Sequence, residues 1–182
     1  MEIQTRLIET GDYAAGKANV RFTKHFPREH RNGIMEKMRM VVEHFPEYWE
    51  RTIIVGLEGD MTLYGGHFVS IDDHEIRIRL VKDADLWLIA HELTHGIQYI
   101  SNIPTGEKSC DLYCLARCYD YATHAPTYLD FPEEVRDNWY DWIEVAHFIA
   151  KDAIERRDKG LRNYIKFFED KLTEMVKESV AK

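Results

Sequence analysis

Residues 87–98 read Trp-Leu-Ile-Ala-His-Glu-Leu-Thr-His-Gly-Ile-Gln, and they contain the most informative feature of the chain, His91-Glu92-Leu93-Thr94-His95. His91 and His95 are four residues apart, so on an α-helix they lie one turn above each other and both imidazoles can reach one divalent ion. Glu92 projects about 100° round the helix, close enough to accept a proton from a metal-bound water. This is the arrangement of zinc-assisted hydrolysis. The sequence therefore predicts one zinc ion bound by a helix.

The segment around these histidines is predicted to be helical for reasons that do not involve them. Asp83 or Asp85 can cap its start, and the break at residues 102–104 marks its end. Both histidines and Gln98 fall together, on a different side from the apolar stripe. That stripe recurs at helical spacing and consists of Leu86, Ile89, Leu93, Ile97 and Ile100.

A hydrolytic zinc ion needs a third protein ligand and one open position. A site of the metzincin type would carry glycine at position 98 and a third histidine at position 101. This chain has Gln98 and Ser101 there, which excludes that type. The third ligand is therefore sought after the break at residues 102–104.

A second helix is predicted directly after this break. Thr105 is a plausible N-cap, and Glu107 falls in the first turn. Glu107 and Asp111 are four residues apart, so both carboxylates lie on one face of the helix. Either carboxylate can be directed towards a metal ion that the first helix binds.

The motif His-Glu-Leu-Thr-His followed by Glu-x-x-x-Asp on the next helix resembles the gluzincin pattern of thermolysin-like zinc peptidases and minigluzincins. The resemblance covers about residues 91–111, with a shorter link between the helices than in thermolysin. A short-linked arrangement is also similar to regulatory peptidases related to the phage-repressor-cleaving family. The resemblance implies that His91, His95 and Glu107 bind zinc and that Glu92 is the general base. It implies that Asp111 accepts the second ring N–H of His91 and fixes its tautomer.

Glu107 has two rivals as third ligand. Asp111 could coordinate directly, with Glu107 on the surface. Cys110 could bind as a thiolate, which would favour a structural or inhibited site. The helix phase favours Glu107 with Asp111, because Cys110 is rotated by about 60° from Glu107.

Oxyanion stabilisation requires a further donor or cation. Our candidate for this catalytic role is His124, in a predicted loop after the second helix. The other side chains considered are Tyr113, Tyr119, Tyr121, Tyr128 and His147.

The rest of the chain predicts an α+β fold. It comprises a small antiparallel or mixed sheet packed against the zinc-site helix, with a C-terminal helical subdomain. Residues 1–31 give mixed signals, and an amphipathic helix is predicted at about 31–46. Strands are predicted at 51–57, within 61–71 and at 74–80. The resemblance implies that strand 74–80 is the sheet edge beside the zinc, where an extended peptide adds.

Two helices are predicted towards the C-terminus. A long one starts at residues 130–133 with proline in its first turn, and a last one follows Gly160. At 182 residues and 45% hydrophobic content, the chain is predicted to be one domain. Its N-terminal α+β part spans residues 1–101 and carries the motif helix. Its helical part spans residues 102–182 and carries the third ligand.

Composition limits the compartment and the partners. There is no apolar run of about 18 residues, and the first residues lack a basic-then-apolar signal. We therefore expect no membrane association and a cytoplasmic protein. Cys110, Cys114 and Cys118 recur every four residues on one helix, which is typical of small packing residues and reduced thiols. A net charge of −8 argues against nucleic acid as a partner, and the basic clusters at 21–31 and 156–162 are interpreted as solvated surface.

Two functional hypotheses follow. The first is a zinc metallopeptidase (a hydrolase) that cleaves a peptide or protein substrate with Glu92 as general base. The second is a non-enzymatic zinc-bearing protein-interaction or regulatory module. The presence of Glu92 favours the first, because a purely structural site needs no base beside an open position.

Overall fold

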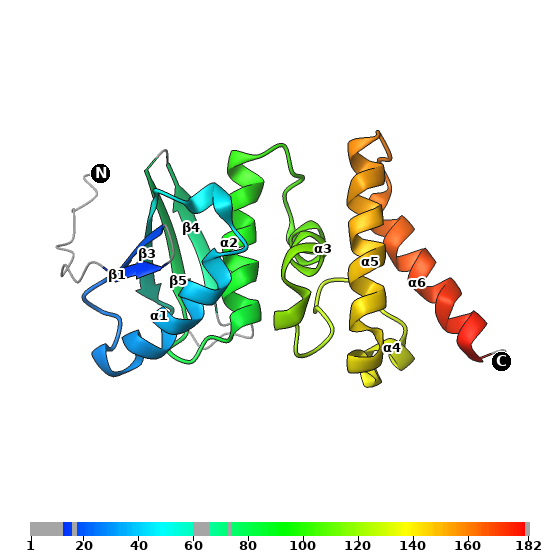
Figure 1. Cartoon of the computed structure of the whole chain (residues 1–182), viewed down its shortest axis with the longest axis horizontal. Coiled ribbons are helices and arrows are strands. Elements are labelled where there is room, and N and C mark those ends of the chain that lie inside the picture. The colour runs from blue at the N-terminus through cyan, green and yellow to red at the C-terminus, as the bar shows by residue number, and fades with distance from the viewer. Residues whose placement is uncertain (1–12, 16–17, 60–65, 73, 181–182) are drawn as a thin grey trace. The chain divides into compact units, whose positions relative to one another are not determined.

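The computed structural model describes residues 13–15, 18–59, 66–72 and 74–180, and it divides into two units, Met1–Ser101 and Asn102–Lys182. The first unit combines a sheet with helices, and the second is helical (Figure 1). The predicted α+β fold class is confirmed. The division falls at the helix break used above to separate the two parts of the chain.

The first unit is built on a five-stranded mixed sheet with strand order β1-β2-β3-β5-β4. The three inner strands β2, β3 and β5 run parallel, whereas β1 and β4 pair antiparallel with their neighbours. A β-bulge between Phe68 and Ser70 interrupts the β4–β5 pairing. The strands are β1 Tyr13–Ala15, β2 Ala18–Phe22, β3 Thr52–Leu57, β4 Gly66–Ile71 and β5 Glu75–Leu80.

The two long helices of the first unit, α1 (Arg28–Val42) and α2 (Leu86–Ile100), pack against the sheet and each other. Helix α1 contacts β1 and β2, while α2, which carries the histidine motif, contacts β4 and β5 (Figure 1). A short 3-10 helix, η1 (Pro46–Tyr48), follows α1. The predicted alternation of β5 is confirmed: Ile76, Ile78 and Leu80 are buried, and the arginines between them are exposed.

One prediction about the sheet is wrong. Strand β5 is not the edge, because β4 turns back and pairs antiparallel with its free side. The edge beside α2 is therefore β4. Of the strand predicted within 61–71, residues 61–65 lie outside the described part of the chain. The segment 1–31, whose sequence signals are mixed, contains strands β1 and β2.

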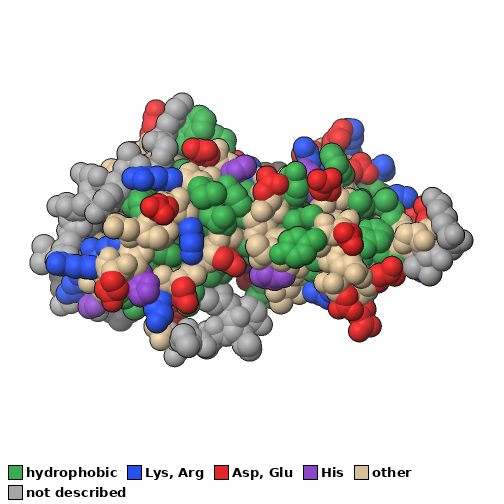
Figure 2. Space-filling model, turned by 60° about the horizontal axis from the view of Figure 1, so that its bottom comes forward, with side chains coloured by type: hydrophobic (Ala, Val, Ile, Leu, Met, Phe, Trp, Pro, Cys, Tyr) green, Lys and Arg blue, Asp and Glu red, His purple; other side chains and the backbone are tan. Residues whose placement is uncertain are grey.

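The second unit consists of helices joined by turns and loops. Helix α5 packs against both α3 and α6. Its elements are α3 Glu107–Cys118, the 3-10 helix η2 Tyr119–Tyr121, α4 Glu133–Asp137, α5 Trp139–Asp158 and α6 Tyr164–Val180. The three cysteines of α3 form no disulfide within the described residues and are buried, as their predicted packing role requires. Acidic and hydrophobic side chains are interspersed on the face of this unit seen in Figure 2.

Three local signals can be compared with the structure. Asp85 is the N-cap of α2, and its carboxylate accepts from the Leu88 N–H at 2.8 Å, as predicted. The predicted N-cap Thr105 is wrong, because Gly106 holds that position, with no side-chain hydrogen bond. The single long helix predicted to start at residues 130–133 is also wrong, because the backbone leaves helical geometry at Asn138 and separates α4 from α5. None of the helices in the described ranges is long and apolar enough to cross a membrane.

Candidate metal centre

The imidazoles of His91 and His95 converge on α2. Their Nε2 atoms are 3.1 Å apart, and the ring planes are inclined by 83°. Two nitrogens bound to one tetrahedral zinc ion lie roughly 3.3 Å apart, given Zn–N distances of about 2.0–2.1 Å. The spacing of the two ring nitrogens therefore fits a shared divalent ion.

Gln98 orients the second of these histidines. Its side-chain Oε1 lies 2.9 Å from Nδ1 of His95, so it accepts a hydrogen bond from the Nδ1–H tautomer. That tautomer leaves the Nε2 lone pair of His95 available to a metal. The sequence places Gln98 on the histidine side of the helix but does not assign it this role. Its spacing of three residues from His95 was the available signal.

Glu92 is held against the edge strand. Only 4% of its surface is exposed. Gly66, the first residue of β4, packs directly on it: a Cβ at position 66 would lie 2.7 Å from Oε1 and 3.0 Å from Cγ of Glu92. Any larger residue at position 66 would displace the carboxylate. The predicted general base is thus positioned by the strand that forms the sheet edge.

A second glycine brings α2 close to the sheet. A Cβ on Gly96 would lie 2.7 Å from Cδ1 of Ile76 on β5 and would also collide with the Tyr48 hydroxyl. That hydroxyl donates to the backbone carbonyl of Leu93 and links η1 to the motif helix. Bonds and contacts inside the first unit therefore fix the orientation of α2.

The predicted ligands of the second unit lie on α3 in different surroundings. Glu107 is the first residue of the helix and is exposed. Asp111 is buried, with 1% of its surface exposed, and its Oδ2 accepts from the Tyr128 backbone N–H at 2.8 Å. The predicted roles of Glu107 as a ligand and of Asp111 as the partner of His91 stay predictions.

Within the first unit, His91 and His95 are donors that could hold a metal ion. Imidazole nitrogens suit several transition metals, so this donor pair does not specify zinc. The structure thus supports a possible metal site but not the identity of the ion.

His124, the predicted oxyanion residue, is exposed after η2, and its Nδ1 lies 3.3 Å from the Thr123 hydroxyl. His147 bonds the Leu115 carbonyl through Nδ1 at 3.1 Å and stacks on Tyr119, with 4.1 Å between ring centroids. These contacts tie His147 into the helical packing, and the catalytic role of His124 stays a prediction.

Comparisons with models of known protein families, with curated proteins and with solved structures gave no match.

Proposed function

We propose that this protein is a zinc-dependent peptidase that hydrolyses peptide bonds. The observation that carries the proposal is the geometry of α2. His91 and His95 present Nε2 atoms 3.1 Å apart, and Glu92 is buried one residue after the first histidine. A structural metal site has no need for a confined carboxylate next to its ligands.

The proposed ligands are His91, His95 and Glu107. A zinc ion bound there would lower the pKa of a water molecule and polarise the carbonyl group of a peptide. Glu92 would accept the proton of the attacking water and return it to the leaving amine. Gln98 keeps His95 in the tautomer that can bind metal.

The edge strand supports a peptide as substrate. Strand β4 pairs with β5 on one side and is the last strand of the described sheet. Its first residue, Gly66, touches Glu92. An extended peptide that paired with β4 through main-chain hydrogen bonds would place its backbone next to the general base.

A second candidate function is a non-enzymatic zinc-bearing module, and the Cys110 thiol favours it. In this candidate function the thiolate of Cys110, which is fully buried, would be the third ligand beside His91 and His95. A thiolate as third ligand is common in structural zinc sites. In that case Glu92 would have no catalytic role.

The experiment is a comparison of zinc-loaded wild type with Glu92→Gln on a mixture of random-sequence peptides, followed by mass spectrometry. We expect zinc-dependent cleavage by the wild type. The variant should retain its zinc and lose activity by about 10²-fold or more, the usual effect of removing a general base. Glu36→Gln, on the exposed side of α1, is the matched control and should cleave like the wild type.

Two results would reject the peptidase. One is an unchanged cleavage rate in Glu92→Gln. The other is a wild type with stoichiometric zinc that cleaves none of the peptides, which would favour the non-enzymatic module.

A further inference from the structure

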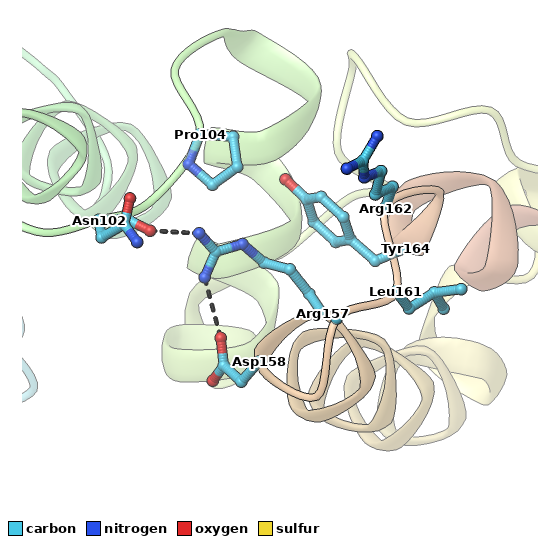
Figure 3. A pocket seen from close by; sticks show the side chains of 8 residues that line it. Asn102, Pro104, Arg157, Asp158, Leu161, Arg162 and Tyr164 are labelled. Carbon is cyan, nitrogen blue, oxygen red and sulfur yellow. Dashed lines mark hydrogen bonds and ion pairs between the residues drawn. The ribbon is translucent and has the colours of Figure 1, made fainter.

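A pocket of about 520 Å³ lies in the second unit where α5 ends and α6 begins (Figure 3). Its volume is within the range of small-molecule sites, about 300–1,000 Å³. None of its lining residues takes part in the proposed peptidase chemistry. It includes part of the basic cluster 156–162, which the sequence alone predicts to be solvated surface.

The turn after α5 gives the pocket its shape. Gly160 has φ of 105°, a left-handed conformation that favours glycine. Its N–H donates to the Arg157 carbonyl at 2.8 Å, and the Leu161 N–H donates to the Arg156 carbonyl at 2.9 Å. This pair of bonds is the Schellman motif that ends many helices. It reverses the chain so that side chains from both sides of the turn line one pocket.

Two arginines line this pocket, and their hydrogen-bonding states differ. The Arg157 guanidinium already has two partners. It forms an ion pair with Asp158 at 2.9 Å and donates a hydrogen bond to the Asn102 backbone carbonyl. Arg162 has no ion pair or hydrogen bond with any residue in the described ranges. The lining contains two arginines and one acidic residue, Asp158, so it carries an excess positive charge in a protein of net charge −8.

Aromatic and apolar groups complete the wall. In Figure 3 the Tyr164 ring lies between the side chains of Arg157 and Arg162, and its hydroxyl bonds the Ser109 hydroxyl at 3.0 Å. Pro104 and Leu161 add apolar surface. The pocket therefore offers a free charged donor beside an apolar wall.

We infer that this pocket binds a small organic anion, with its carboxylate or phosphate on Arg162 and its apolar part against Pro104, Leu161 and Tyr164. The planar guanidinium of an arginine matches both carboxylate and phosphate oxygens in a bidentate manner. This inference is independent of the proposed peptidase activity.

The test is calorimetric titration of the full chain with benzoate, phenyl phosphate and the neutral analogue benzyl alcohol. We expect saturable binding of at least one anion, with Kd of about 1 mM or tighter, and binding of benzyl alcohol at least tenfold weaker. The anion that binds more tightly identifies the headgroup. Higher ionic strength should weaken the binding of the anion but not the binding of benzyl alcohol.

Arg162→Gln should weaken anion binding about tenfold, as expected for loss of a charge-assisted hydrogen bond. Arg162→Lys keeps the positive charge but loses the planar pair of guanidinium donors. Its affinity for the anion should lie between that of Arg162→Gln and that of the wild type. Lys171→Gln is the matched control: it removes the same charge from α6, but Lys171 pairs with Glu174 outside the pocket. Equal binding of the anions and benzyl alcohol, no saturation by 10 mM (about tenfold above the expected Kd), or wild-type affinity in Arg162→Gln would overturn the inference.

Discussion

Helices α2 and α3 carry every metal ligand considered for this protein, and they hold these residues in different ways. On α2, His95 is bonded by Gln98 and Glu92 is confined by Gly66, so the motif is positioned within one unit. On α3, Glu107 is exposed at the first helical position, whereas Cys110 is fully buried. A spacing of four residues within one helix brings two candidate ligands together, whereas the position of a third candidate depends on tertiary packing.

The largest expected effect separates the candidates on α3. We expect His95→Ala and Glu107→Ala each to lose stoichiometric zinc, because two remaining ligands cannot hold the ion as three do. Cys110→Ser should keep its zinc. Metal analysis of the purified variants measures this.

Cys118→Ala is the matched control for a cysteine on the same helix. Burial raises the pKa of Cys118 to about 12, so this thiol stays protonated at neutral pH and is not expected to bind metal. Zinc lost from Cys110→Ser and kept by Glu107→Ala would assign the third ligand to the thiol. That result would favour the non-enzymatic module.

A smaller effect is expected at the residues that orient the histidines. Gln98→Leu removes the acceptor for the His95 ring and should lower zinc affinity by about 10- to 100-fold. Gln98→Glu keeps an acceptor and should bind zinc close to wild type. Competition titration with a zinc chelator measures both. Unchanged affinity in Gln98→Leu would mean that the rest of α2 suffices to orient His95.

The same titration sharpens the comparison with α3. Asp111→Ala should also lower zinc affinity by about 10- to 100-fold if this carboxylate orients His91. Its observed bond to the Tyr128 N–H gives it a packing role as well. A loss of thermal stability without any change in zinc affinity would leave only that packing role.

The smallest expected effect concerns the contact between strand and base. In Gly66→Ala the added methyl group would collide with the Glu92 carboxylate, and we expect cleavage to slow by about tenfold with zinc content unchanged, because catalytic groups are sensitive to small displacements. Gly33→Ala, on the exposed side of α1, has nothing within 4 Å of its new Cβ and is the control. Equal rates in the two variants would show that Glu92 tolerates the displacement.

Local sequence signals predicted what local geometry determines. The apolar stripe, the Asp85 cap and the spacing of His91 and His95 define α2, and the alternation of β5 defines a half-buried strand. Contacts between residues that are distant in the sequence were not predictable from these local signals. The pairing of β4 outside β5 depends on strand order, and the contact of Gly66 with Glu92 joins residues 26 positions apart in the chain. The N-cap of α3 is Gly106 and not the adjacent Thr105, because the backbone at position 106 takes a positive φ of 110°, which favours glycine.

The bulge in β4 has a consequence for self-association. A straight, unpaired edge strand is a template on which further copies of a chain can stack as a growing sheet. The irregularity between Phe68 and Ser70 breaks the ladder after its first residues, so a second copy of β4 cannot align along its whole length. The strand therefore offers only a short straight segment, next to Glu92. The interrupted register makes β4 a poorer template for a fibril, which needs an uninterrupted ladder.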